Sequence, residues 1–493
     1  MYKLIVKNTI QSVLAISLLV GVVSCTDLEP NYDDSFPNED ESGDFSGIDP
    51  ANALETAYNQ LNGLGGQDKT YALEEVTSDQ LVVLTRGADW GDNGVWRTLH
   101  QHNWTPLHSY ILGTWNDRNS AILQLNKIIA PVSNATPSQL AEAKTLRAIN
   151  MFYVMDLYGQ VPFRGVNDGD SDPIVMQRAE AFDFIVKDLT EAIPDLSAGN
   201  LSDNYTITRS TANFMLAKVY LNKQVYTGSS DAADFTKVVE YVDAITADGY
   251  ALDADYFGIF LPGHANKEII LALNTWTGMR VFNILHANQG GWNGFATLAE
   301  VYDSFDANDI RLGEPNLNGI GTGMLVGQQY DADGSKLKDR GGNDLVFTKD
   351  FPTGILGNNE RTGVRPHKYT HSVDGKASPI NGSVLYRYSD AVLMKAEAIM
   401  RGGTSALTAE SILDNLRTLR GVTATGTYSL DDILAERGRE LWVEGWRRND
   451  QVRFGTFANT WDMKTVTDEH RVLFPIPASA VATNPNLTQN PGY

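Results

Sequence analysis

The sequence predicts a mainly α-helical protein, in which pairs of helices form a scaffold and two loop-rich stretches interrupt it. Segments with apolar residues at every third or fourth position recur along the chain and end at Gly or Pro. The stretches 65–114 and 250–384 lack long helical periods, and the second is rich in Gly, Asn and Asp. Hydrophobic residues make up 42% and charged residues 20% of the 493 positions, so the chain can bury a core and is not globally disordered.

The first half of the chain predicts four helices in succession. Asp49 followed by Pro50 is typical of a helix start, and helical spacing of apolar residues continues to residue 64. Further helices are expected at about 115–129, 137–158 and 181–193, because each has an apolar period of about 3.6 residues and a Gly or Pro stop. The chain therefore begins its ordered part as a series of packed helices.

Two later segments resemble repeats. The segments 209–249 and 388–421 each predict two helices separated by a glycine-containing turn, and the second has the size of a tetratricopeptide unit, about 34 residues. Turn-forming sequences at 330–334 and 340–343 predict β-hairpins in the second loop-rich stretch. Binding sites usually form on long irregular segments that a rigid scaffold holds, so the loop-rich stretches are the candidates for function.

The N-terminal residues are predicted to be a secretory signal. Two lysines precede an apolar stretch at 13–23, which is too short to span a membrane comfortably. Residues 22–25 (VVSC) resemble a bacterial lipobox, and Cys25, the only cysteine of the sequence, is the expected lipidation site. The segment 26–46 contains eight acidic residues and no basic one, which predicts an extended tether.

These observations predict the domain organisation. It consists of a lipoprotein signal peptide with lipidated Cys25 (1–25), an acidic flexible tether (26–48), an N-terminal helical region (49–250) with a binding loop (65–114), and a C-terminal region (251–493) with a loop-rich insert (251–384).

Composition and motifs exclude several classes of function. The formal net charge is −22 and the isoelectric point about 4.7, so a nucleic-acid partner is not expected. The sequence contains no nucleophile elbow, no P-loop and no His-Glu-x-x-His motif. A histidine group at 100–108 lacks a fourth zinc ligand, and Lys336 replaces the glycine that a calcium loop requires. We therefore expect no catalytic residue, no metal and no cofactor.

A charged segment near the C-terminus allows two interpretations. Its glutamates are spaced four residues apart, as on one helix face, and arginines alternate with them; the residues are Glu436, Glu440, Glu444, Arg437, Arg439 and Arg447. Two of the carboxylates could act as a general acid and base, or all could form ion pairs that brace the scaffold. Neighbouring arginines lower a carboxyl pKa, which is wrong for a general acid, so ion pairing is favoured.

Tryptophans in the loop-rich stretches predict a sugar-binding site. A flat indole covers the C–H face of a sugar ring, while Asp, Asn and Arg side chains bind its hydroxyl groups. Two patches combine these residue types, and the expected binding residues are Arg86, Asp89, Trp90, Asn93, Trp96, Trp292 and Asn293. We expect other tryptophans to pack in the core, namely Trp104, Trp115, Trp442, Trp446 and Trp461, and leave Trp276 open between the two roles.

Four stretches resemble the SusD/RagB family, the outer-membrane glycan-binding lipoproteins of Bacteroidetes. They are 146–163, which includes DLYGQVPF, then 386–398 (YRYSDAVLMKAEA), 436–455, which includes ERGREL, EGWR and DQVRFG, and the ending, FPIP with NPNLTQNPGY. Gly438 stands where the family commonly has an arginine, and Phe454 where it has a tryptophan. With the lipobox, the resemblance extends over the whole chain.

The resemblance implies both a fold and a function. Family members have tetratricopeptide-like helix pairs that support a loop-rich half, and they form a hinged lid on a TonB-dependent transporter of the SusC type. They bind oligosaccharides at the cell surface without cutting them, and relatives with a similar tryptophan pair suggest a neutral β-glucan such as laminarin. A glycoside hydrolase and a peptide-capturing lid of an oligopeptide transporter remain the alternatives.

Overall fold

Helices dominate the structure, with 45% of the residues in helices and 12% in strands, as the sequence predicts. The computed structural model describes residues 44–169, 171–199, 201–261, 266–378 and 380–493, and residues 48–493 form one compact unit. The expected lipidation site Cys25, its signal peptide and nearly all of the acidic tether lie outside the described residues. Within the described part of the chain, no helix has both the length and the apolar character that crossing a membrane requires.

The elements follow the predicted order. The α-helices are α2 (Pro50–Asn62), α3 (Lys69–Glu75), α4 (Val95–His100), α5 (Ser109–Ile129), α6 (Pro137–Tyr158), α7 (Arg178–Ala192), α8 (Arg209–Leu221), α9 (Lys223–Thr227), α10 (Ala232–Ala247), α11 (Gly278–Phe282), α12 (Ala299–Asp303), α13 (Tyr388–Met400), α14 (Ala409–Leu419), α15 (Leu430–Glu440), α16 (Arg447–Arg453) and α17 (Ala478–Thr483). The strands are β1 (Val82–Val83), β2 (Gln160–Phe163), β3 (Ile174–Gln177), β4 (Ile269–Trp276), β5 (Phe295–Ala296), β6 (Gly323–Leu325), β7 (Gly327–Gln328), β8 (Val346–Phe347), β9 (Arg365–His367), β10 (Ser372–Val373), β11 (Lys376–Ala377) and β12 (Asn381–Arg387).

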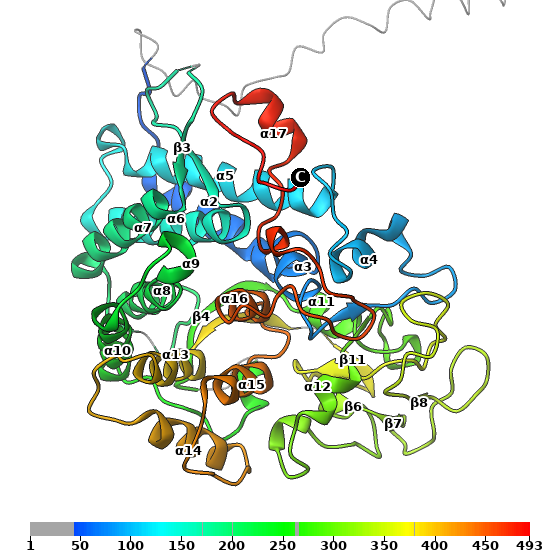
Figure 1. Cartoon of the computed structure of the whole chain (residues 1–493). Coiled ribbons are helices and arrows are strands. Elements are labelled where there is room, and N and C mark those ends of the chain that lie inside the picture. Colours follow the sequence, from blue (N-terminus) through cyan, green and yellow to red (C-terminus); the bar gives the residue numbers. More distant parts are fainter. Residues whose placement is uncertain (1–43, 170, 200, 262–265, 379) are drawn as a thin grey trace, which may run out of the picture. The chain divides into compact units, whose positions relative to one another are not determined.

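Successive helices pack side by side to form the scaffold. Helix α6 packs on α5 and α7, α8 packs on α10, α10 packs on α13, and α13 packs on α14. Figure 1 shows α7, α8, α10, α13 and α14 following one another along one side of the molecule, with the short strands β6, β7, β8 and β11 gathered on the other. The predicted helix-pair scaffold and loop-rich half are both present.

Local sequence signals explain where the helices begin and end. The Asp49 side chain accepts a hydrogen bond from the backbone of Asn52 at the start of α2. Thr136 and Gln139 form a reciprocal capping box at the start of α6, and Gly159, with φ 78°, ends that helix in the left-handed region that glycine favours. Helix α5 begins six residues before the expected Trp115, because the His108 side chain caps its first turn.

Short antiparallel strand pairs organise the loop-rich half. The longest pair, β4 with β12, connects this half to the scaffold, because β12 leads directly into α13. The predicted turns at 330–334 and 340–343 are confirmed, and Gly334 and Gly342, each with φ 84°, supply the left-handed residues that these turns need. A separate antiparallel pair joins β1 from the first loop-rich stretch to β5 from the second.

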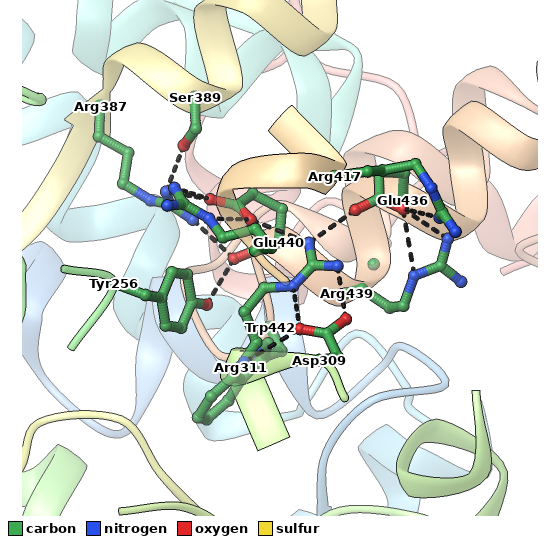
Figure 2. A network of polar contacts seen from close by, with 12 residues as sticks. Tyr256, Asp309, Arg311, Arg387, Ser389, Arg417, Glu436, Arg439, Glu440 and Trp442 are labelled. Carbon is green, nitrogen blue, oxygen red and sulfur yellow. Dashed lines mark hydrogen bonds and ion pairs between the residues drawn. The ribbon is translucent and has the colours of Figure 1, made fainter. Parts of the chain in front are cut away.

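A buried network of ion pairs connects the scaffold to the loop-rich half. Glu440 accepts hydrogen bonds from Arg387 at 2.7 Å, from Arg311 at 2.9 Å and from Arg420 at 2.9 Å, and all four side chains are at most 1% exposed. Figure 2 shows Arg311 and Arg387 converging on Glu440, with Asp309 on the far side of Arg311. Burial alone would raise the pKa of Glu440, but the three guanidinium groups hold it well below its usual range.

The ion-pair interpretation of the charged segment is therefore confirmed, but its predicted geometry is partly wrong. Helix α15 ends at Glu440, and Glu444 lies beyond it in a buried break that includes Val443 at φ 54°. Glu444 pairs with Lys368 and Arg387, which come from other parts of the chain. Long-range partners could not be deduced from spacing along one helix.

Candidate functional site

A cavity of about 640 Å³ lies where the two predicted tryptophan patches meet. The first loop-rich stretch contributes Gln67 and the tryptophan loop 85–94, and the second contributes the segment 286–293, Arg340 and Glu360. The lining residues are Gln67, Ala88, Asp89, Trp90, Asp92, His286, Ala287, Gly291, Trp292, Asn293, Arg340 and Glu360. Patches that lie about 200 residues apart in sequence thus line one site, because the pairing of β1 with β5 places the two stretches side by side.

Trp90 and Trp292 are the aromatic residues of the cavity. Trp292 is 49% exposed, and Trp90 is partly buried. The Trp90 indole Nε1 donates a hydrogen bond to the backbone oxygen of Trp292 at 2.8 Å. This bond holds the Trp90 ring beside the patch that contains Trp292. A Cβ atom at position 294 would come within 2.3 Å of the Trp90 ring, so only glycine allows the indole to lie on the backbone at Gly294.

Trp96 does not present an aromatic face to the cavity, in contrast to the sequence-based expectation. It is 2% exposed and packs against Phe295, Tyr110 and Trp90, with ring centroids 5.5, 5.0 and 6.1 Å away. Its Nε1 donates to the Asp92 carboxylate at 2.7 Å. Trp96 is therefore a core residue beneath the loop, enclosed by Phe295 from the second loop-rich stretch and by Tyr110 from α5.

Arg86 and Asn293 are also buried, and they hold loops together. The Arg86 guanidinium donates to the backbone oxygens of Asn293, Asn359 and Thr362, and its burial lowers its pKa to about 9. The Asn293 amide donates to the backbone oxygen of Glu360 at 3.0 Å. Arg86 does not line the cavity, so a direct role for it in binding sugar is not supported. Asn293 does line the cavity, and its hydrogen bond to Glu360 also connects two loops.

The tryptophan loop has an unusual backbone. Trp90, Asp92 and Asn93 have φ values of 59°, 37° and 53°, in the left-handed region that residues other than glycine rarely adopt. Such strain persists only where surrounding contacts enforce it, and it is concentrated at functional sites. Asn93 is exposed but does not line the cavity, whereas the exposed Asp89 does.

Sequence reasoning missed a group of polar residues that lines the cavity together with the tryptophans. Glu360 accepts hydrogen bonds from the backbone of Arg340 at 2.8 Å and from His286 Nε2 at 3.0 Å, and the Arg340 guanidinium contacts both Glu360 and Asp89. Burial alone would raise the pKa of Glu360, but the hydrogen bonds from His286 and Arg340 lower it to about 2. The turn at 340–343 was recognisable in the sequence, but its position beside the cavity was not.

Trp276 continues the row of aromatic side chains beyond the cavity. It is 41% exposed, and its ring lies 5.3 Å from Phe282, which in turn lies 5.6 Å from Trp292. The tryptophans expected in the core are indeed buried; they are Trp104, Trp115, Trp442, Trp446 and Trp461.

His100 and His102, at the end of α4 and just after it, are packing residues. His100 and His102 are buried, and His102 Nε2 lies 2.7 Å from the backbone oxygen of Thr77. In the described ranges, no group of three or more His, Cys, Asp or Glu side chains could hold a metal ion.

Comparison with known families and structures explains this architecture. A family model described as "SusD family" matches residues 267–493, and a second, described as "Starch-binding associating with outer membrane", matches residues 31–221. The chain belongs to the SusD family. The two matches leave residues 222–266 between them, a segment of this SusD-family protein that contains the scaffold helices α9 and α10.

Relatives of known structure share the fold. The chain is 25% identical to the starch-binding protein SusD of Bacteroides thetaiotaomicron, over 99% of both chains. It is similar to a SusD superfamily protein from Parabacteroides distasonis, with a TM-score of 0.71, 20% identity and coverage of 90% of this chain and 98% of that one. Surface glycan-binding protein A from Bacteroides thetaiotaomicron, solved in complex with laminarihexaose, aligns with a TM-score of 0.65, 20% identity and the same coverage.

Proposed function

We propose that the protein is a cell-surface lipoprotein that binds an oligosaccharide in the cavity and delivers it to a SusC-like, TonB-dependent transporter. The observation that carries the proposal is the cavity itself, in which Trp90 and Trp292 lie beside Asp89 and Arg340. Aromatic faces with a few fixed polar groups are the combination that a sugar ring requires, because one surface of the ring is apolar and its edge carries hydroxyl groups.

A neutral glycan suits this cavity best, and a β-glucan such as laminarin is our first choice. Three carboxylates and one guanidinium line the cavity, from Asp89, Asp92, Glu360 and Arg340. A uronic or sulfated polymer would therefore meet an excess of negative charge. The laminarihexaose complex of one structural relative supports a β-glucan, and the starch-binding relative makes an α-glucan the second polymer to test.

The protein is proposed to bind its glycan without cleaving it. A glycoside hydrolase needs a carboxyl group that is protonated near neutral pH, and the pKa of Glu360, about 2, makes it unsuitable. We expect purified protein to be retarded in native gels that contain laminarin or soluble starch and to release no new reducing ends from either polymer. New reducing ends would favour the hydrolase, and retention of oligopeptides in place of glycans would favour a peptide-capturing lid.

Membrane anchoring and the partner form the second part of the proposal. A signal peptide at 1–25, lipidation at Cys25 and the tether 26–48 would hold the protein at the outer-membrane surface. We expect the mature protein to copurify with a TonB-dependent transporter when native membranes are solubilised in mild detergent. A Cys25→Ala variant provides the control, since it should lose both a fatty-acid label and membrane association. Recovery of the native protein only as a free monomer would contradict the delivery step.

A further inference from the structure

We propose that Arg340 and Asp89 act as one recognition unit that binds adjacent hydroxyl groups of an uncharged sugar ring and excludes acidic glycans. The inference rests on the glycan-binding function proposed above. It adds a specificity-determining pair to the aromatic surface, and it predicts which chemical change in the glycan the site will reject.

Arg340 lines the cavity and connects the hairpin to the tryptophan loop. Its Nε donates to Glu360, and its Nη2 donates to Asp89 Oδ2 at 3.0 Å. The Arg340 and Asp89 side chains are 59% and 55% exposed, so both can reach a ligand. Among the described residues, no hydrogen bond uses Arg340 Nη1 or Asp89 Oδ1. The pair therefore offers a donor and an acceptor side by side, which matches two neighbouring hydroxyl groups.

Glu360 fixes the position of the guanidinium. Its carboxylate is 17% exposed and is held by His286 Nε2 and by the backbone of Arg340. Because Glu360 is anchored in this way, the Arg340 side chain is oriented before a ligand arrives. A preoriented donor loses little conformational freedom on binding, which favours affinity.

The same ion pairs account for selectivity against acidic glycans. The single guanidinium of the lining is already matched by the carboxylates of Asp89 and Glu360, and Asp92 adds a further negative charge. A carboxylate or sulfate on the glycan that approached Arg340 would lie beside the negative charges of Asp89 and Glu360. Like charges placed together make the wrong ligand unfavourable, which is a common basis of specificity.

The test compares neutral polymers with their acidic derivatives. Native affinity gels contain laminarin or soluble starch, or the carboxymethyl derivative of either polymer, so that backbone and linkage stay the same while charge changes. The variants are Arg340→Gln and Asp89→Asn. The control is Lys338→Gln, which removes a cation that is 62% exposed on the same hairpin but outside the cavity lining. Thermal melts accompany each gel.

We expect the wild type and Lys338→Gln to bind the neutral polymers equally and the carboxymethyl derivatives much more weakly. Arg340→Gln should weaken binding of the neutral polymers about tenfold or more, as expected for a lost hydrogen bond to a charged group. Asp89→Asn keeps an acceptor oxygen but loses its charge, so it should gain affinity for the carboxymethyl derivatives. All melting temperatures should stay near that of the wild type, because both side chains are exposed.

The outcomes separate this inference from the function on which it rests. Wild-type binding to laminarin or starch that Arg340→Gln leaves unchanged would overturn the recognition role while the proposed function stands. Equal rejection of carboxymethyl polymers by wild type and Asp89→Asn would overturn the proposed basis of selectivity. Failure of the wild type to bind either neutral polymer would contradict the proposed function, and this inference with it.

Discussion

Replacement of Glu440 by alanine should lower the free energy of unfolding by about 3–5 kcal/mol, the cost typical of breaking a buried ion pair. Glu440 is fully buried and accepts hydrogen bonds from three buried arginines, Arg311, Arg387 and Arg420. Alanine would remove the carboxylate with which all three guanidinium groups pair, while the guanidinium groups would stay buried. Asp309 and Glu444 would still pair with Arg311 and Arg387, but each of the three arginines would lose a buried carboxylate partner, and a buried guanidinium whose charge is matched less completely is costly.

Urea unfolding followed by circular dichroism measures this effect. Glu191→Ala provides a matched control, because Glu191 pairs with Lys144 at 2.8 Å on the surface and its side chain is 45% exposed. The control should change the free energy of unfolding by at most about 1 kcal/mol. If Glu440→Ala costs no more than Glu191→Ala, the buried network does not brace the scaffold against the loop-rich half.

Replacement of Trp292 by alanine should weaken glycan binding by roughly 5- to 150-fold and leave stability nearly unchanged. Stacking on one ring is worth about 1–3 kcal/mol, by analogy with bases stacked on aromatic side chains, and 1.4 kcal/mol corresponds to a tenfold change in affinity. Trp292 is half exposed, so its truncation removes little buried surface. Trp96 should behave in the opposite way, because truncating a buried tryptophan costs about 3–5 kcal/mol of stability.

Much of the fold could be predicted from the sequence because local signals determine it. Asp49, the Thr136 capping box and Gly159 mark helix ends through bonds within a few residues of the chain, and the structure has these ends where they were expected. The two tryptophan patches could also be identified as candidate binding patches, since aromatic residues framed by Gly and Asn are poor core material. That they form one cavity follows from the pairing of β1 with β5, which no local pattern reveals.

The roles of individual site residues could not be predicted, because they depend on contacts between distant segments. Trp90 and Trp96 look alike in the sequence and both pack against Phe295, yet Trp96 also packs against Tyr110 and is buried, whereas Trp90 is only partly buried. The Arg86 side chain could bind sugar hydroxyl groups, but its N–H groups donate hydrogen bonds to backbone oxygens more than 200 residues away along the chain. The turn that contains Arg340 could be predicted, but a role for Arg340 in the site could not, because its partners Asp89 and Glu360 are not its neighbours along the chain.

The central claim, that the cavity beside Trp90 and Trp292 binds glycan, is tested most directly by pairing affinity gels with thermal melts. Trp292→Ala and Trp90→Ala are run in gels containing laminarin or soluble starch, with Trp96→Ala and Trp446→Ala as variants of buried tryptophans. We predict that Trp292→Ala loses retardation while melting like the wild type, that Trp90→Ala loses retardation as well, and that the two core variants melt early. A Trp292→Ala protein that melts at the wild-type temperature and is still fully retarded by the polymer that the wild type binds would contradict the account.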